Sequence, residues 1–139
     1  MTRPADQAVC APGIAIVIPA LNEKENLDLL LPALKEVVAG MGITAEIVVV
    51  DGGSRDGTRD AAEKRGARVI LQTEPGYGGA LRAGFAATAA PYIVTMDADL
   101  SHRPVFLEEF WRRRDEAEVL IASRYVAGGR ADMGWFRRL

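Results

Sequence analysis

Short apolar runs recur along the chain, separated by longer stretches of mixed character. A run that is apolar at successive positions, not only at alternate ones, is typical of a strand covered on both faces of a sheet. Val94, Thr95 and their neighbours also favour extended backbone. The pattern predicts buried strands at Ile14–Ile18, Glu46–Val50, Arg68–Leu71, the run that begins at Tyr92 and ends in Asp97 and Asp99, and Val119–Ala122.

The stretch after the first predicted strand has the pattern of an amphipathic helix. Asn22 followed by Glu25 resembles a capping box, which predicts the start of the helix. Pro32 lies inside the apolar pattern, so we expect a kink or a break there. The apolar positions at helical spacing are Leu27, Leu30, Leu31, Leu34 and Val38.

Three further helices are predicted between the later strands. A short helix runs from about residue 56 to 64, and an Ala- and Gly-rich helix covers about 79 to 88, where small side chains allow close packing on a sheet. Pro104 is suitably placed at the first position of the last helix. Its apolar face contains Phe106, Leu107, Phe110 and Trp111.

Strands and helices therefore alternate with short connections. This alternation predicts an α/β fold, a Rossmann-like, doubly wound and mainly parallel sheet with helices on both faces. The sequence shows no repeat, low-complexity tract or internal domain boundary. We expect residues 1–13 to be a flexible N-terminal tail and residues 14–139 to form one folded unit.

Composition narrows the functional classes. The chain has 139 residues, 49% of them hydrophobic, which is ordinary for one globular domain. A net charge of −2 implies no general attraction to nucleic acid, so no nucleic-acid partner is expected. The single cysteine, Cys10, cannot form an internal disulfide, which fits a reducing, cytoplasmic compartment. We expect neither a signal peptide nor a bilayer-spanning segment, which would need about 18–20 apolar residues.

Polar residues follow three of the predicted strands, at Pro19–Glu23, Asp51–Asp56 and Asp97–Asp99. The carboxyl ends of parallel strands lie along one edge of a sheet, where open α/β sheets bind their ligands. We therefore expect the three clusters to converge. Taken singly, each could be a turn or a helix cap.

Asp97 and Asp99 form the most informative pair. In extended backbone, positions i and i+2 point the same way, so the two carboxylates would project together beyond the strand. Hard oxygen ligands of this kind suit Mg²⁺ or Mn²⁺, usually completed by water and substrate phosphates. The alternative is a pair of solvated aspartates that cap the next helix. A nucleotide would need the metal here, because a carboxylate cluster repels bare phosphate.

Other chemistries find little support. Residues 76–81 begin like a dinucleotide-binding loop but place Leu81 where its third glycine should stand, and no P-loop motif exists. Cys10 and His102 cannot assemble a zinc site. No serine lies in a nucleophile-elbow pattern, and we interpret His102 as a loop residue instead of a general base.

Four ordered motifs carry a family resemblance. Ile16 to Glu23, Val49 to Thr58, Met96 to His102, and Ser123 to Gly129 together resemble a family 2 glycosyltransferase of the GT-A fold. Within that family they are most similar to the dolichol- or polyprenol-phosphate mannosyltransferase branch. The resemblance covers residues from Ile14 to the C-terminus.

The resemblance implies roles for individual residues. It implies catalytic roles for Asp97, Asp99 and Arg124, and a metal bound by Asp97 and Asp99. Arg124 would meet phosphate oxygens, where a guanidinium fits well, although it could also be a strand-end arginine paired with a surface carboxylate. The implied nucleotide-binding residues are Pro19, Leu21, Glu23, Asp51, Asp97 and Ala98.

The sequence departs from the family pattern at three places. Leu21 stands where the family usually has an aromatic residue, and Gly52 where it usually has a second aspartate. Family catalytic domains also continue beyond Leu139, so we expect a domain truncated at its C-terminus. Trp135, Phe136 and Leu139 alternate with arginines, a pattern that suits a membrane surface or a partner chain, although a final helix turn or a disordered tail would also fit.

The resemblance implies inverting, metal-dependent transfer of a sugar, mannose from GDP-mannose, to a polyprenyl phosphate acceptor, at the cytoplasmic face of a membrane. One alternative is a transferase that uses a UDP-sugar and another acceptor. A second is a non-catalytic nucleotide-binding or assembly module. A nucleotidyltransferase also uses carboxylates and Mg²⁺, but its usual glycine- and lysine-rich N-terminal loop is absent.

Overall fold

A computed structural model describes residues 12–123 of the chain. Strands and helices alternate along the described part, as the hydrophobic pattern predicts. The elements are β1 (Ile14–Ala20), α1 (Lys24–Met41), β2 (Ala45–Asp51), α2 (Thr58–Lys64), β3 (Arg68–Leu71), α3 (Gly76–Ala86), β4 (Tyr92–Thr95) and α4 (Phe106–Arg113).

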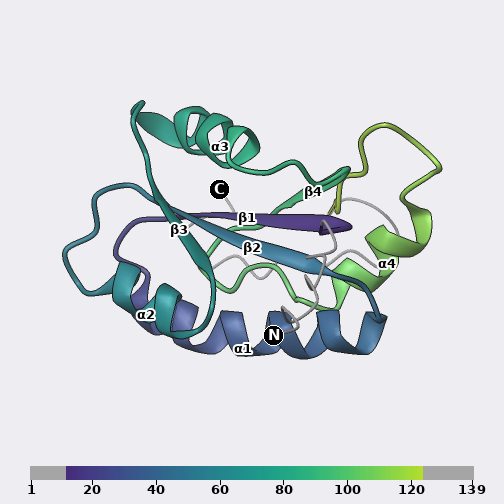
Figure 1. Ribbon diagram of the computed structural model, residues 1–139, viewed down its shortest axis with the longest axis horizontal. Helices are drawn as coiled ribbons and strands as arrows, with labels where there is room; N and C mark the ends of the chain where they lie inside the picture. The colour runs from purple at the N-terminus through teal and green to yellow at the C-terminus, as the bar shows by residue number, and fades with distance from the viewer. Residues whose placement is uncertain (1–11, 124–139) are drawn as a thin grey trace, which may run out of the picture.

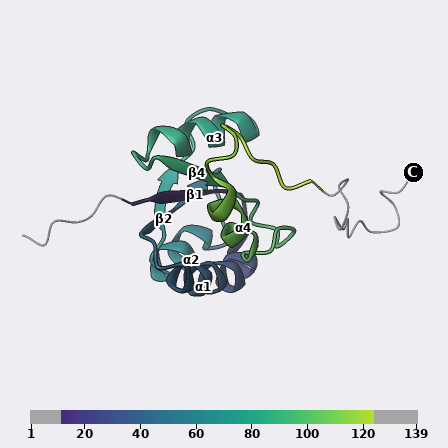
Figure 2. The same ribbon diagram turned by 90° about the vertical axis from the view of Figure 1, so that its right-hand side faces the viewer.

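The four strands form a parallel sheet in the order β3-β2-β1-β4 (Figure 1). Helices α1 and α2 cover one face of this sheet, and α3 covers the other (Figure 2). Helix α4 lies beside α1 at the end of the sheet where β1 begins. The predicted α/β, doubly wound fold is thus confirmed.

Alternate residues of the central strands pack on opposite faces of the sheet. Ile16 and Ile18 of β1 join the larger hydrophobic cluster beneath α1, whereas Val17 joins a smaller cluster beneath α3. Side chains on both faces are almost fully buried, which explains why the β1 sequence shows no alternation. Helix α3 approaches β1 closely, because a Cβ at Gly84 would overlap the Val17 side chain.

Two details of α1 differ from the sequence-based predictions. The helix continues through Pro32 without a break. Pro32 is exposed, so water can hydrate the carbonyl that loses its intrahelical partner. The predicted capping box is wrong: the N-cap position is Glu23, no side chain of the helix caps it, and Asn22 has a left-handed φ of 54°.

The later helices also begin at other residues than predicted. Helix α3 begins at Gly76, three residues earlier than expected, and α2 begins at Thr58. Helix α4 begins at Phe106, so Pro104 precedes it instead of occupying its first position. On α4 only Leu107 is fully buried, whereas Phe106 remains 42% exposed.

The strand predicted at Val119–Ala122 is absent: these residues have no regular secondary structure. Val119 is 73% exposed and Ile121 is 81% exposed, so neither finds the cover that a buried strand needs. In the described part of the chain, β4 therefore has a neighbour on one side only. No helix of this part is long and apolar enough to cross a bilayer.

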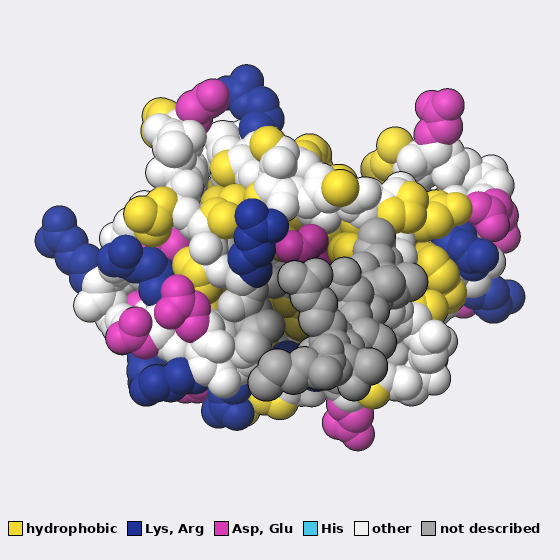
Figure 3. Space-filling model, in the orientation of Figure 1, with side chains coloured by type: hydrophobic (Ala, Val, Ile, Leu, Met, Phe, Trp, Pro, Cys, Tyr) yellow, Lys and Arg dark blue, Asp and Glu magenta, His cyan; other side chains and the backbone are white. Residues whose placement is uncertain are grey.

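Basic and acidic side chains are interspersed over the face shown in Figure 3. No large region of one sign is seen on that face, which agrees with the net charge of −2. Binding of an anionic ligand on this face must therefore depend on local groups and not on a general field.

Candidate functional site

The carboxyl ends of β1, β2 and β4 lie along one edge of the sheet, as predicted. Ala20 pairs with Asp51 at the ends of β1 and β2. The ladder extends beyond the strands, since the Gly52 N–H donates to the Ala20 carbonyl at 2.9 Å and the Met96 N–H to the Val17 carbonyl at 3.0 Å. The three polar clusters that follow these strands are thereby fixed on a common frame.

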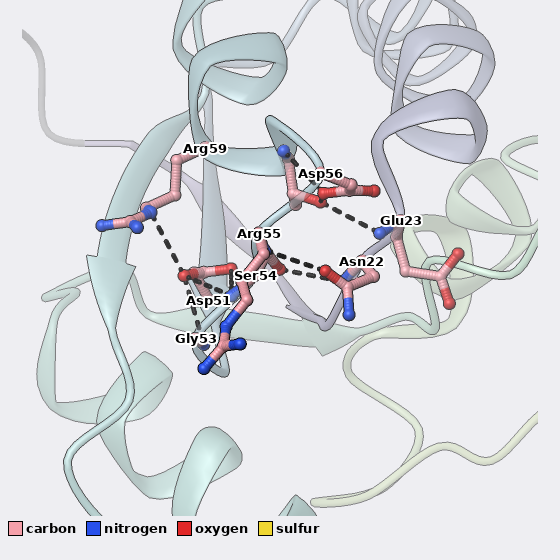
Figure 4. Close-up of polar contacts among 9 residues, drawn as sticks. Asn22, Glu23, Asp51, Gly53, Ser54, Arg55, Asp56 and Arg59 are labelled. Carbon is pink, nitrogen blue, oxygen red and sulfur yellow. Dashed lines mark hydrogen bonds and ion pairs between the residues drawn. The ribbon is translucent and has the colours of Figure 1, made fainter.

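Asp51 is buried at the end of β2, with only 1% of its surface exposed. Its carboxylate accepts hydrogen bonds from the N–H groups of Gly53 (3.2 Å) and Ser54 (3.1 Å to Oδ1). The Arg59 Nε lies 3.4 Å from Oδ2 and forms an ion pair with it. The carboxylate thus both shapes the turn after β2 and meets a cation (Figure 4).

Hydrogen bonds join the loop after β2 to the start of α1 (Figure 4). The Asn22 N–H donates to Ser54 Oγ at 2.8 Å, and the Arg55 N–H donates back to Asn22 Oδ1 at 2.9 Å. Ser54 is itself buried. This reciprocal pair holds the two loops together and explains the left-handed backbone of Asn22, which we expected to be a local cap.

Asp56 of the same loop and Thr58, the first residue of α2, accept from the N–H groups at the start of α1. The Glu23 N–H donates to Thr58 Oγ1 at 3.0 Å, and the Lys24 N–H to Asp56 Oδ2 at 3.1 Å. Asp56 also accepts from the Thr58 N–H at 2.9 Å and from its hydroxyl. The hydrogen bond from the Thr58 hydroxyl is the main cause of the lowered pKa of Asp56. The start of α1 is therefore capped from outside the helix.

The other nucleotide-binding residues predicted near β1 surround this junction. Pro19 is partly buried, Leu21 is 58% exposed, and the Glu23 carboxylate accepts from Asn26 Nδ2 at 2.6 Å. Of these three residues only Glu23 lines an open concavity of about 330 Å³, together with Asn22, Lys24, Glu25, Asn26 and Asp56. A second concavity of about 560 Å³ lies over Ser54, Arg55, Gly57, Thr58, Arg59, Asp60 and Glu63.

Asp97 and Asp99 lie beyond β4, which ends at Thr95, and a turn begins at Ala98. The expectation that the backbone is extended through Asp99 is wrong, because β4 ends at Thr95 and residues 98 and 99 form a turn. Ala98, between them, is 3% exposed and packs in the larger hydrophobic cluster. The turn is thus anchored by Ala98 while Asp99 is exposed and Asp97 is half-buried.

Both carboxylates accept hydrogen bonds within the described part of the chain. Asp97 Oδ1 accepts from the Tyr77 hydroxyl at 3.1 Å, and Asp99 Oδ1 accepts from the Ser101 N–H at 3.0 Å. Hydrogen bonding by the Ser101 side chain, then by its backbone, lowers the pKa of Asp99. Burial, followed by the nearby charge of Asp97, raises the pKa of Tyr77.

The turn that carries Asp97 and Asp99 offers the type of ligand that Mg²⁺ or Mn²⁺ prefers, but few of them. Asp97 and Asp99 offer hard carboxylate oxygens, but the described residues contain no group of three or more His, Cys, Asp or Glu that could hold a metal. An ion here would therefore need most of its ligands from water and substrate phosphates, as Mg²⁺ sites with one or two carboxylates do. A self-sufficient protein cage is excluded within the described part.

Sequence reasoning missed several residues of this edge. The sequence predicts only a helix at Thr58 and Arg59 and indicates no role for Tyr77. Their partners are 20 to 35 positions away or belong to another element, which no local pattern reveals. His102 lies in the loop, as predicted, where its Nδ1 accepts the Asp97 N–H at 3.3 Å. Arg124, Trp135, Phe136 and Leu139 lie outside the described residues.

Comparisons with known proteins place the chain among sugar transferases. The family model "Glycosyl transferase family 2" matches residues 15–138. A dolichol-phosphate mannosyltransferase of Pyrococcus furiosus is 34% identical over 131 residues, which cover 90% of this chain and 37% of the relative. An uncharacterized glycosyltransferase of Mycobacterium tuberculosis is 34% identical over 112 residues, 81% of this chain and 48% of the relative.

Solved structures of glucosyl-3-phosphoglycerate synthase from Mycobacterium tuberculosis share the fold. One, in complex with Mn²⁺, UDP and glucosyl-3-phosphoglycerate, has a TM-score of 0.65 and 28% identity over 82% of this chain and 46% of that chain. Another, with Mn²⁺, UDP-glucose and phosphoglyceric acid, has a TM-score of 0.65 and 29% identity, and covers 74% of this chain and 39% of that one. The chain thus spans less than half the length of these relatives and structures.

Proposed function

The chain belongs to glycosyltransferase family 2, and from that premise we propose that it carries the donor-binding part of an enzyme that moves mannose from GDP-mannose to a polyprenyl phosphate. The observation that carries this proposal is the convergence of three polar clusters at the carboxyl edge of the sheet, with Asp97 and Asp99 beyond β4. The similarity to a dolichol-phosphate mannosyltransferase supports the choice of donor and acceptor.

The nucleoside would lie against the ends of β1 and β2, near Leu21 and Asp51. The Asp51 carboxylate shapes the turn after β2 by holding the Gly53 and Ser54 N–H groups. Its side chain is fully buried, so a hydrogen bond from base or ribose to Asp51 Oδ1 requires this turn to open when the donor binds. Arg59 offsets the negative charge of this buried carboxylate, which lowers its repulsion of the diphosphate.

Asp97 and Asp99 would hold Mg²⁺ or Mn²⁺ together with the donor diphosphate. A bound divalent ion supplies stabilisation of the charge that develops on the leaving nucleoside diphosphate. The crystallised neighbours that contain Mn²⁺ with UDP support divalent metal dependence in this fold. Arg124 is proposed to contact phosphate oxygens as well.

The acceptor chemistry needs no dedicated general base. A polyprenyl phosphate is already anionic near neutral pH, so its oxygen can attack the sugar carbon directly while the nucleoside diphosphate leaves. His102 fits this view, since its Nδ1 accepts the Asp97 N–H. We place the reaction at the cytoplasmic face of a membrane, with the C-terminal segment toward the lipid or a partner chain.

A UDP-sugar transferase with another acceptor is the second candidate. It is favoured by the structural neighbours, which bind UDP or UDP-glucose with Mn²⁺. Calorimetric titration of GDP-mannose, UDP-glucose and UDP-GlcNAc in the presence of Mn²⁺ separates the two. The proposal requires tightest binding of GDP-mannose, whereas a preference for a UDP-sugar would contradict the mannosyl assignment.

The third candidate is a non-catalytic nucleotide-binding or assembly module, which the short span of the chain relative to its relatives keeps open. Turnover of GDP-mannose with a polyprenyl phosphate distinguishes this candidate. Metal-dependent binding without transfer would favour the module over the enzyme.

A further inference from the structure

We propose that Tyr77 is a positioning residue for Asp97: its hydroxyl fixes one carboxylate oxygen and thereby directs the other to the metal-bound diphosphate. The proposal rests on the function proposed above. Tyr77 belongs to the first turn of α3, whereas Asp97 follows β4, so the contact joins two elements at the binding edge. The phenol oxygen lies 3.1 Å from Asp97 Oδ1, within ordinary hydrogen-bond range.

The backbone that presents Tyr77 is held firmly. Gln72 Nε2, in the loop before α3, donates to the carbonyls of Glu74 at 2.5 Å and Gly76 at 2.7 Å. Gly76 has a φ of +84°, which favours glycine, and a Cβ at Gly79 would overlap the Glu74 carbonyl. The loop and the first turn of α3 therefore have little freedom, so the backbone fixes the position from which the Tyr77 side chain projects.

Asp97 is held on its other side through its backbone. Its N–H donates to His102 Nδ1 at 3.3 Å, and the preceding Met96 N–H donates to the Val17 carbonyl of β1 at 3.0 Å. These bonds fix the main chain but leave the carboxylate free to rotate. The Tyr77 hydroxyl supplies the missing restraint, since it engages Oδ1 and leaves Oδ2 without a hydrogen bond among the described residues.

The chemical type of the restraint matters. A lysine or arginine at this place would form an ion pair and offset the negative charge that attracts a divalent ion. A phenol is a neutral donor, so it orients the carboxylate while the charge remains available. Tyr77 is 56% exposed, so the hydrogen bond contributes little to folding. Its effect should therefore appear in metal-dependent binding and not in stability.

Tyr92 offers a matched control in the same chain. Its hydroxyl lies 2.8 Å from Asp115 Oδ1, and Tyr92 begins β4, at the edge of the sheet away from Asp97. Tyr77→Phe and Tyr92→Phe each remove one phenol–carboxylate hydrogen bond and keep the ring. Only the first removes a bond to Asp97.

The test compares GDP affinity of the full chain, Tyr77→Phe and Tyr92→Phe by calorimetry, once with Mn²⁺ and once with EDTA, alongside thermal melts. We expect Tyr77→Phe to weaken GDP binding about fivefold with Mn²⁺, with no change in EDTA or in Tm. Tyr92→Phe should bind GDP as the parent does under both conditions.

Two results overturn the positioning role while leaving the proposed function intact. One is unchanged Mn²⁺-dependent affinity in Tyr77→Phe. The other is an equal loss with Mn²⁺ and EDTA, which would mean that Tyr77 supports the fold of the site and does not act through Asp97. A parent chain that binds no GDP, GDP-mannose or UDP-glucose with Mn²⁺ would refute the proposed function, and the positioning role would fall with it.

Discussion

The carboxylates of Asp51, Asp97 and Asp99 at the binding edge differ in how many hydrogen bonds and ion pairs they already make within the protein. Both oxygens of Asp51 are engaged by backbone N–H groups or by Arg59, and the side chain is fully buried. Asp97 and Asp99 are more exposed, and within the described part of the chain they accept hydrogen bonds from Tyr77 and Ser101. Asp51 therefore combines a structural role with its proposed contact to the nucleoside, whereas the other two are free to meet a ligand.

Arg59 permits a prediction at the residue scale. Arg59→Gln removes the cation beside the buried Asp51 carboxylate, so we expect weaker GDP binding and a free energy of unfolding lower by about 1 kcal/mol. Arg55→Gln is the control, because Arg55 is an exposed arginine of the loop just before α2 and has no ion pair with Asp51 among the described residues. Calorimetry and urea denaturation measure both effects. Equal behaviour of the two variants would show that the ion pair has no role.

Among the elements, the strands could be predicted because their signal is local. The apolar runs of β1 and β2 coincide with residues that are almost fully buried. The start of α1 could not be predicted, because its caps are Thr58 and Asp56, more than 30 positions away. The run at Val119–Ala122 shows the opposite failure: a strand-like sequence remains exposed because no neighbouring element covers it.

Thr58 connects the start of α1, the start of α2 and the loop that joins β2 to α2, which leads to a second prediction. Thr58→Val keeps the shape of the buried side chain but leaves the Glu23 N–H without its acceptor, so the free energy of unfolding should fall by about 1–3 kcal/mol. Thr73→Val, at an exposed position, should change it little. Urea denaturation measures both variants. Equal stabilities would mean that the cap contributes nothing measurable.

Helix α3 permits a third prediction. Gly84→Ala should destabilise the chain by about 1–3 kcal/mol, because the new methyl group overlaps Val17 and forces α3 away from β1. Gly78→Ala is the control in the same helix, since its Cβ would meet no atom within 4 Å. That variant should be neutral or stabilising by up to about 1 kcal/mol. Thermal melts that rank the two variants in the other order would contradict the close packing of α3.

A cluster of aromatic and ionic contacts lies at the opposite edge of the sheet from the proposed site. At the edge where the strands begin, Trp111 packs edge-on against Tyr92, with ring centroids 5.5 Å apart, and the Arg114 guanidinium lies 4.3 Å from the Trp111 ring. Arg68 there bonds to Glu46 at 3.1 Å and to the Ala87 carbonyl at 2.7 Å. The opposite edge holds the carboxylates proposed to bind the donor. Variants of Asp97 and Asp99, which are not fully buried, should affect binding more than folding.

The convergence of the polar clusters was predictable from sequence, because parallel strands end at a common edge. The arrangement of Asp97 and Asp99 was not, since it depends on where β4 ends and on the turn anchored by Ala98. The sugar nucleotide that the site binds also cannot be predicted from local sequence motifs. The relatives include a mannosyltransferase by sequence and a glucosyl-3-phosphoglycerate synthase by structure, and the chain spans less than half of either.

The central claim is that this edge binds a sugar nucleotide through a divalent ion at Asp99. Its most direct test is calorimetric titration of GDP-mannose with Mn²⁺ into the parent, Asp99→Ala, and Asp115→Ala as an exposed aspartate of the opposite edge. Asp99→Ala should lose more than about tenfold in affinity at unchanged Tm, because a ligand of the ion is removed. Asp115→Ala should match the parent. Undiminished Mn²⁺-dependent binding by Asp99→Ala would contradict the claim.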